Sequence, residues 1–597
     1  MRVASIYSAF NARWLEPEDV ARSFVATTHF ESLLRTQNSL LMGPRGCGKT
    51  TLLKMLTRRA QKTWIEERLT NEKTAQDYRP PDFEVIYIAS DIRWSSELDS
   101  LSDALPASPK VAELVQRCLV SISALIECTK TFEEILEEKD IDPTELAKKF
   151  IVHFALGPTL PFFAEIRVRL RDWIEVLQGH LVRGDQAGLE KVLAAHHSSL
   201  FAHSLSAPTK ACSIFDEFVR TAAPARWALC FDEIEIAPKW LQDELFRALR
   251  SFDQRFLLKI TWSPILPEAL TFTQERQHDF EAIQMWHGHV NDARPFCKEF
   301  ATRYIQDKFR SPALMPREVF GNSLFSQEES EGSEVYGRGS AIWLAMQRLA
   351  GHDESFRRYL EDHNISPDNP TALDVAVRDK SLRKAKPVVI LREAYRGKNN
   401  GQRQRRSRKN APIFFGEDVI YAMSEGNPRL LRGILNDLFD EEGKPSSPWP
   451  IAPEVQSRVF NAAAERTLAG IRAYPTKGSP QKKSLADIVE SVGNYLHDEL
   501  VFSEFSVDPV GGFFVDGDVA PSAVQDISVG LLIGAFVHVK TKDNDLPSSI
   551  VGSRFRLSYM LSPRFGLPFR ANRAIRLSTA LKVQSAGQRA INFLEDR

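Results

Sequence analysis

The chain has 597 residues, 43% of them hydrophobic and 26% charged, and its 77 Lys and Arg nearly balance its 78 Asp and Glu. This composition is typical of a globular protein of several domains and excludes a uniformly basic nucleic-acid-binding protein, so nucleic-acid binding would depend on local basic patches. Six scattered cysteines without a C-x-x-C pair favour reduced thiols over disulfides or a zinc site. We find no apolar run suited to a signal peptide or a bilayer span, and we expect a cytoplasmic protein without a membrane partner.

Short helices are predicted near the N-terminus, at 17–24 and 30–34, where apolar residues recur at helical spacing. A buried strand is predicted at 38–42 and a helix at 51–60. Between these two elements the chain reads G-P-R-G-C-G-K-T from Gly43 to Thr50. This is the complete pattern G-x-x-x-x-G-K-[ST] in its strand–loop–helix context, which indicates a phosphate-binding loop.

The phosphate-binding loop predicts binding of a nucleoside triphosphate. Its glycines let backbone N–H groups surround an anion at a helix N-terminus. Lys49 is suited to reach the β- and γ-phosphates, and the Thr50 hydroxyl is a Mg²⁺ ligand. We therefore expect ATP and Mg²⁺ as cofactors, with the nucleotide held by Gly43, Pro44, Arg45, Gly46, Cys47, Gly48, Lys49, Thr50 and Thr51.

Strand and helix patterns alternate through residues 1–294, which we interpret as one α/β domain with a parallel sheet. Between about 95 and 222 only helical spacing is found, and we predict a helical insertion there. Beyond the strand at 38–42, the predicted strands are 83–89, 226–233, 256–262 and 280–286.

A buried strand that ends in Asp232 and Glu233 is the second strong signal. In a protein with a phosphate-binding loop, the carboxylate at such a strand end helps to hold Mg²⁺, as in the Walker-B arrangement. We therefore predict Asp232 as a metal ligand and Glu233 as the general base that polarises the attacking water. Glu235 is an alternative base, and Thr261 and Ser263 are candidates to orient that water or are ordinary strand-end hydroxyls.

Two arginines are further catalytic candidates. Arg276 precedes the last predicted strand of the sheet, where an arginine finger could act across a subunit interface, although surface arginines are common. Arg429 follows a Gly-Asn-Pro turn and begins a helix, from which a guanidinium can reach a γ-phosphate.

The order of these motifs resembles the AAA+ ATPases, and within them the origin-recognition (initiator) clade and its bacterial relatives. The segment from Ala21 to Leu34 is similar to the adenine-side segment of that clade. Two features depart from the pattern: the polar position after the fourth strand is not Asn, and the insertion is long. The resemblance implies a helical lid, a C-terminal winged helix, and nucleotide contacts at Lys49, Thr50, Asp232, Glu233 and Arg429.

Residues 295–445 are predicted to form the helical lid region. Within it, the basic segment 378–409 holds thirteen Lys and Arg against two acids. Such a run can contact nucleic-acid phosphates without reading sequence, and it can equally be a solvated loop.

Residues 446–597 are predicted to form a winged-helix-like α+β domain. A capping box at Ser484 starts one helix, a second is expected near 522–533, and strands are expected at 536–540 and 554–559. Winged helices bind DNA or serve as protein-binding or autoinhibitory modules. The candidate contacts to double-stranded DNA are Arg554, Arg556, Arg564, Arg570 and Arg573.

We therefore expect an ATP-binding and ATP-hydrolysing AAA+ protein that acts as a nucleotide-dependent assembly switch. The expected partners are a second copy of the chain in a homo-oligomer, double-stranded DNA and a separately encoded effector protein. The expected settings are replication, a mobile element or anti-phage defence. The alternative is a STAND-type signalling NTPase whose winged helix is autoinhibitory. A non-hydrolysing scaffold is disfavoured by the intact Asp232-Glu233 pair.

Overall fold

A computed structural model describes residues 12–582, with gaps, and these are the residues discussed below. Arg276 and residues 397–409 of the basic segment lie outside the described residues. None of the helices in the described ranges is both long enough and apolar enough to cross a bilayer. The gaps are 72–79, 91–93, 95–108, 196–202, 220–225, 251, 268–269, 271–278, 326–338, 367–374, 397–411, 442–448, 475–483, 541–545 and 572.

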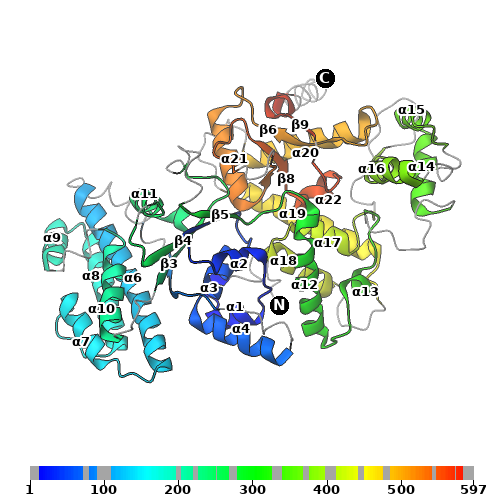
Figure 1. The fold of residues 1–597 in the computed structure, drawn as a ribbon. Helices are drawn as coiled ribbons and strands as arrows, with labels where there is room; N and C mark the ends of the chain where they lie inside the picture. Colours follow the sequence, from blue (N-terminus) through cyan, green and yellow to red (C-terminus); the bar gives the residue numbers. More distant parts are fainter. Residues whose placement is uncertain are drawn as a thin grey trace.

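A parallel five-stranded sheet forms the centre of the N-terminal half of the molecule (Figure 1). Its strand order is β2-β3-β4-β1-β5, so that β4 separates β1 from β3. All five strands lie where the sequence predicts them, within two residues at either end. Their bounds are β1 Ser39–Met42, β2 Glu84–Ala89, β3 Trp227–Asp232, β4 Phe256–Trp262 and β5 Glu281–Gln284.

Alternate strand residues enter two hydrophobic cores, one on each face of the sheet, as the side-chain period of two requires. Leu41, Ala228 and Cys230 pack against the N-terminal helices. Leu40, Leu229 and Phe231 pack against the insertion and α11 (Lys239–Ala248). The N-terminal elements are η1 Ala12–Trp14, α1 Pro17–Arg22, α2 Thr28–Leu33, α3 Lys49–Met55 and α4 Arg58–Asn71.

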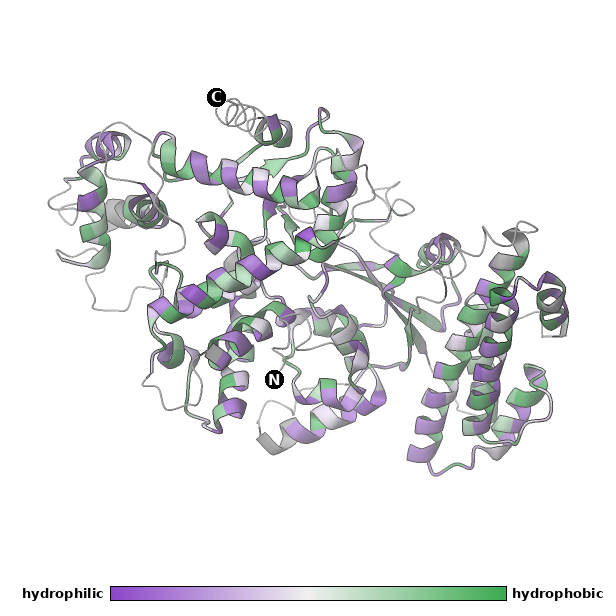
Figure 2. Cartoon of the chain, turned by 180° about the vertical axis from the view of Figure 1, so that it is seen from behind, coloured by the Kyte–Doolittle hydropathy of each residue, from purple (hydrophilic) through white to green (hydrophobic). Residues whose placement is uncertain are grey.

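The predicted insertion is a helical bundle at the β2 edge of the sheet, where α6 packs against β2 (Figure 1). Its helices carry alternating hydrophilic and hydrophobic bands, as amphipathic helices do (Figure 2). Inside the bundle Phe132, Phe150 and Phe215 are buried. The helices are α6 Pro109–Glu138, α7 Thr144–His153, α8 Phe163–Val182, α9 Gln186–Ala195 and α10 Ser206–Val219; the short η5 Ile234–Ile236 follows β3.

The region after the sheet is helical, as predicted for the lid, and is built on a separate core that includes Leu431, Ile434 and Leu438. α12, α17 and α18 pack together beside the phosphate-binding loop, whereas α14, α15 and α16 form a group farther out (Figure 1). The bounds are α12 Val290–Phe309, α13 Pro316–Phe320, α14 Ala341–Ala350, α15 Glu354–Asp362, α16 Val375–Tyr395, α17 Glu417–Ser424 and α18 Pro428–Glu441.

The C-terminal domain contains the predicted helices and hairpin, together with two strands that we did not predict. β7 and β8 are antiparallel, β8 pairs with β6, and β9 lies parallel to β6 at the edge of the sheet. A single described helix, α21, lies between β6 and β7, in the position of a recognition helix. The bounds are α19 Pro453–Arg472, α20 Leu485–Phe502, β6 Val510–Phe514, α21 Pro521–Ile533, β7 Phe536–His538, β8 Arg554–Leu557, η9 Tyr559–Leu561, α22 Ser562–Phe565 and β9 Arg573–Arg576.

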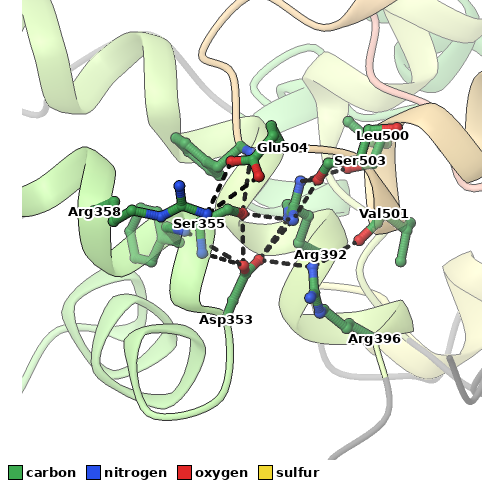
Figure 3. A network of polar contacts seen from close by, with 11 residues as sticks. Asp353, Ser355, Arg358, Arg392, Arg396, Leu500, Val501, Ser503 and Glu504 are labelled. Carbon is green, nitrogen blue, oxygen red and sulfur yellow. Dashed lines mark hydrogen bonds and ion pairs between the residues drawn. The ribbon is translucent and has the colours of Figure 1, made fainter. Parts of the chain in front are cut away.

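A buried ion-pair network joins the outer helices α14–α16 to the end of α20 (Figure 3). Asp353 and Arg392 are 0% and 1% exposed, and Asp353 accepts hydrogen bonds from Arg392 Nε (2.8 Å) and Arg396 Nη1 (3.1 Å). Arg392 also donates to the carbonyl of Ser503 (3.0 Å). The network therefore fixes the outer helices on the C-terminal domain, because breaking it would leave a buried charge unpaired.

Replacing Asp353 by Ala tests this network. We expect Asp353→Ala to cost about 3–5 kcal/mol, because it leaves Arg392 buried and unpaired. The midpoint temperature of the first thermal unfolding transition should fall, and backbone hydrogen exchange should become faster in residues 341–395. The control is Arg358→Ala, whose ion pair with Glu504 is exposed (58% and 77%) and should contribute at most about 1 kcal/mol. Equal effects of the two variants would contradict the network's role.

Candidate functional site

The phosphate-binding loop and the predicted catalytic acids meet at one edge of the sheet. The carboxyl ends of parallel strands share an edge, and ligands of open α/β sheets bind there. Leu41 of β1 is in register with Thr261 of β4, and Phe231 of β3 is in register with Ile260. The strand order therefore places Thr261 between the loop that follows β1 and Asp232 at the end of β3.

The loop has the backbone conformation that its glycines predict. Gly46 and Gly48 have φ angles of +84° and +99°, which side chains other than glycine rarely adopt. Lys49 is buried, and its Nζ donates to the carbonyls of Gly43 (2.5 Å) and Pro44 (3.4 Å). The ammonium group is thus held inside the loop, where phosphate oxygens would be its stronger acceptors. Thr50 lies half-buried in the first turn of α3.

Asp232 is oriented by two hydroxyl groups. Its Oδ1 accepts from Thr261 Oγ1 (2.9 Å) and its Oδ2 from Tyr87 OH (2.8 Å). Thr261 Oγ1 in turn accepts from the Glu233 N–H (2.7 Å). Burial, followed by the charge of Asp232, raises the pKa of Tyr87 well above its usual value, so Tyr87 stays a donor. Thr261 therefore positions both acidic residues, which differs from the predicted role of orienting water.

Glu233 and Glu235, the two candidate bases, have different surroundings. Glu233 has a left-handed backbone (φ 55°), a side chain that is 38% exposed and an ion pair with Arg13 (2.7 Å). Glu235 is half-buried, and partial burial raises its pKa; its Oε2 has no hydrogen-bond partner among the described residues. Since a general base must reach a water molecule, the geometry favours Glu233.

Sequence reasoning missed two residues of this site, Arg13 and Tyr87. Arg13 also donates to the carbonyl of Ser90 (2.8 Å), at the end of β2. Tyr87 is the only hydroxyl-bearing residue in the strand at 83–89. A polar group on an otherwise apolar strand could have indicated that Tyr87 belongs to the site. Arg13 lies far from the motifs in sequence and carries no comparable signal.

A cavity of about 320 Å³ lies where the adenine-side segment was expected. It is lined by Ser23 to His29, by Thr51 of α3 and by Pro428 and Arg432 of α18. Burial lowers the pKa of His29, and it lowers that of His287, whose ring centroid lies 6.0 Å from that of His29, to about 4. Both rings are therefore neutral at pH 7, which suits a flat uncharged nucleobase.

The lid touches the phosphate-binding loop through Asn427 and Arg429. Asn427 Nδ2 donates to the carbonyl of Arg45 (3.1 Å), and its Oδ1 caps α18 by accepting from the N–H of Arg429 (3.0 Å). A Cβ atom added to Gly46 would lie 3.0 Å from Cβ of Arg429. The fold therefore brings Arg429 against the loop, although 379 residues separate it from Thr50 in the sequence.

The C-terminal domain also touches the loop, a contact that we did not predict. The N–H of Arg45 donates to the carbonyl of Leu532 at the end of α21 (2.8 Å). A second cavity, of about 340 Å³, lies between the loop, the lid and this domain. In addition, Leu266 after β4 donates from its N–H to the carbonyl of Pro547, between β7 and β8 (2.9 Å). Both α21 and the segment between β7 and β8 therefore contact the half of the molecule that holds the parallel sheet.

Glu425 of the lid is the main charged contact with the C-terminal domain. It forms an ion pair with Arg556, accepts from Ser558 Oγ (2.7 Å) and accepts from the N–H of Tyr559 (3.2 Å). The Arg556 guanidinium lies 3.8 Å from the centroid of the Tyr559 ring. Both carboxylate oxygens are thus satisfied by one segment, 556–559.

These contacts correct the expected role of several arginines. Arg556 is 2% exposed and paired with Glu425, so the prediction that it contacts DNA is wrong for this arrangement. Arg554 donates to the carbonyl of Ala571 (2.7 Å), and Arg564 pairs with Glu465 (2.8 Å). Arg573 is exposed, as a DNA contact requires.

The residues present suit Mg²⁺. Asp232 and Thr50 offer a carboxylate and a hydroxyl, which are hard oxygen donors, and Mg²⁺ in such sites takes its other ligands from phosphates and water. No cluster of three or more His, Cys, Asp or Glu is found in the described ranges. All six cysteines are free and buried.

Thr261→Val tests the positioning of Asp232. Valine keeps the shape but removes the hydroxyl that bonds Asp232 and the Glu233 N–H, a loss of about 1–3 kcal/mol. We expect the Mg²⁺ concentration for half-maximal ATP binding to rise about tenfold or more. Thr57→Val is the matched control, since Thr57 Oγ1 bonds only the carbonyl of Lys54 among the described groups (2.7 Å). An unchanged Mg²⁺ requirement in Thr261→Val would refute the assignment.

Comparison with known proteins gives one match. A family model described as ORC-CDC6-like matches residues 5–577. No curated protein matches the chain, and no solved structure matches it. The matched span includes the phosphate-binding loop, the strand that ends at Asp232, the lid and nearly all of the C-terminal domain.

Proposed function

This chain belongs to the ORC-CDC6-like family, and on that premise we propose that it is an ATP-hydrolysing AAA+ switch whose output is the position of its C-terminal domain. The family and the five-stranded P-loop fold make it a nucleotide-dependent AAA+ protein. ATP and Mg²⁺ are the cofactors that its site residues suit. Hydrolysis and the response of the C-terminal domain are the parts we propose.

One short run of the lid carries this proposal. Within residues 425–429, Glu425 binds the C-terminal domain, Asn427 binds the phosphate-binding loop, and Arg429 lies against Gly46 of that loop. Arg429, which contacts the phosphate-binding loop, is therefore only four residues along the chain from Glu425, which contacts the C-terminal domain. Because Arg45 is bonded to both Asn427 and Leu532, the loop cannot rearrange without disturbing the lid or the C-terminal domain.

The proposed chemistry follows from the positions of the site residues. Lys49 and the loop amides bind the phosphates, and Asp232 and Thr50 would hold Mg²⁺, which neutralises phosphate charge when bound. Glu233 takes a proton from the attacking water. Arg429 is placed to sense the γ-phosphate through its contact with the loop. Arg276, the candidate for an arginine finger, remains a prediction.

Glu233→Gln tests hydrolysis. We expect this variant to bind ATP with nearly the parent affinity and to lose about 100-fold or more in turnover, because the amide cannot accept the proton of water. Steady-state ATP hydrolysis and nucleotide binding are the measurements, with Lys49→Ala as the variant that loses binding. Glu235→Gln is the matched control and should keep most of the turnover. The reverse pattern would move the general base to Glu235.

The contact with the C-terminal domain is tested by Glu425→Gln combined with Arg556→Met. This double variant removes both charges, so neither stays buried without its partner, which would cost about 3–5 kcal/mol. We expect faster hydrogen exchange in 425–431 and 554–561 without nucleotide, resembling the exchange of the ATP-bound parent. Arg564→Met, in the same domain, is the control. If the hydrogen-exchange rates of these segments change neither on ATP binding nor in the double variant, the proposed movement of the C-terminal domain is wrong.

A second candidate function is a STAND-type signalling switch, and one observation favours it. α21 carries no Lys or Arg, and its C-terminal end bonds the phosphate-binding loop. A recognition helix without cations is poorly suited to DNA, whereas it suits an autoinhibitory contact. A purified monomer with stably bound, slowly hydrolysed nucleotide would support this candidate. ATP turnover that rises with double-stranded DNA would support a DNA-engaged switch.

The remaining expectations are parts of the proposal. We propose that the ATP-bound form assembles into a homo-oligomer and acts with a separately encoded effector protein. Double-stranded DNA is the proposed ligand of the released form. Replication, a mobile element and anti-phage defence remain the candidate settings.

A further inference from the structure

A groove lies along the outer edge of the parallel sheet, and we call it the edge groove. Its volume is about 810 Å³, more than twice the 320 Å³ of the cavity beside His29. It is lined by Val85, Tyr87, Ile88 and Ala89 of β2, which is the edge strand on this side of the sheet. Residues of α6 and α8 line it from one face of the sheet, and residues 13–17, α3 and α4 line it from the other.

Three residues of β2 direct their backbone groups away from the sheet. The N–H groups of Glu84 and Ser90 donate to carbonyls at the two ends of β3 (2.8 and 3.0 Å). Alternate residues of a paired strand direct their backbone groups to opposite sides, so the even-numbered residues of β2 face β3. The N–H and carbonyl groups of Val85, Tyr87 and Ala89 therefore face the groove.

Most of these outward groups have no partner in the part of the chain that the structure describes. Thr131 Oγ1 of α6 donates to the carbonyl of Val85 (3.3 Å), which confirms that this carbonyl points outward. No hydrogen bond from the N–H of Val85, Tyr87 or Ala89 is found within the described ranges. A row of unpaired backbone groups on an edge strand is a template for the addition of another strand.

The charged side chains that line the groove are largely paired already. Arg13 pairs with Glu233, Arg58 with Glu84 and Glu138, Arg59 with Glu134, Lys130 with Glu127, and Arg167 with Glu133, while Lys54 donates to the carbonyls of Arg13 and Leu15. The exposed charges that remain are of both signs, with Arg171 beside Glu16 and Glu175 in the lining. The groove therefore lacks the surplus of positive charge that a nucleotide or a nucleic acid requires, and an uncharged peptide backbone suits it better.

Two side chains offer further contacts to a peptide. Arg167 Nη1 is buried and has no hydrogen-bond partner in the described part of the chain, so a peptide carbonyl would satisfy it. Trp14 lines the groove and is 81% exposed. An exposed aromatic ring beside a groove is typical of the residues that anchor a protein partner.

We propose that the edge groove binds an extended segment of a partner protein, which pairs with β2 as a sixth strand of the sheet. The distance from Val85 to Ala89 along the strand is about 13 Å, so about five residues of the segment pair with β2. A second copy of this chain does not fit, because helices cover both faces of β2 and would collide with the same helices of that copy. This inference rests on the proposed partnership with a separately encoded effector protein, because it names the site at which that protein binds.

A segment bound here would lie beside the catalytic acids. Tyr87 and Arg13 both line the groove, and they bond Asp232 and Glu233, respectively. A strand paired with β2 would hydrogen-bond the backbone of Tyr87 itself. The edge groove thus gives a partner protein a direct contact with residues that position the hydrolytic site.

A phage-displayed library of random peptides, selected on the whole protein without nucleotide, supplies the probe. The strongest binder is then synthesised in a series in which a single N-methyl group is placed on each backbone nitrogen in turn. Only every second N–H of an added strand faces β2. We therefore expect N-methylation at alternate residues to weaken binding about tenfold or more, and N-methylation at the intervening residues to have little effect.

Ser123→Trp and Ala89→Pro test the same site from the protein side. Ser123 lines the groove on α6, and its hydroxyl donates to the carbonyl of Leu119 on its own helix (2.8 Å), so Trp at this position would obstruct the groove. Ala89→Pro removes an outward N–H and keeps the bonds to β3, which is where an edge strand accepts proline. Each variant should weaken peptide binding about tenfold or more. Val152→Trp is the control, since Val152 lies on α7 outside the groove and is 77% exposed.

Three results would overturn the inference. The first is that no selected peptide loses affinity in Ser123→Trp, and the second is that the effects of N-methylation do not alternate along the peptide. The third is a parent dimer that Ser123→Trp dissociates, which would make a second copy the occupant. Because peptide binding is measured without nucleotide, its failure leaves the tests of hydrolysis and of domain movement standing, and their failure leaves the groove standing.

Discussion

The backbone of Arg45 is the point on which the arrangement of the three regions depends. Its N–H is bonded to the C-terminal domain at Leu532, and its carbonyl is bonded to the lid at Asn427. Both bonds use backbone groups of Arg45, which cannot move without moving the chain, so the loop is coupled to the lid and to the C-terminal domain at one residue. Glycine at position 46 suits this arrangement, because its φ of +84° is rare for other residues and a Cβ atom there would lie only 3.0 Å from Cβ of Arg429.

The contacts around the loop differ in energetic character. The ion pair between Glu425 and Arg556 is buried, so its net contribution to stability is small, but losing one partner is costly. Such a pair acts in nearly all-or-none fashion: it is made in the docked arrangement and must be hydrated when the domain leaves. Docking with that property suits a switch with two positions.

Much of the fold follows from local patterns. The strands of the parallel sheet, the phosphate-binding loop and the helical insertion each have a periodicity or motif that needs no partner to be recognised. The pairing of Thr261 with Asp232 could not be predicted, because it depends on β4 lying between β1 and β3. Arg13 is the clearest example of a site residue that the sequence could not predict, since 220 residues separate it from Glu233 and it belongs to no motif.

The amino-acid sequence by itself determined the nucleotide loop, the acidic strand end and the Gly-Asn-Pro-Arg turn, because each is specified by residues adjacent in the chain. The tertiary structure alone decided what these motifs contact. It placed Arg429 beside Gly46, buried Arg556 against Glu425 and left the outer edge of β2 facing a groove. Whether an arginine is a free cation or a buried structural partner depends on which distant carboxylate the fold brings to it, and local sequence does not contain that information.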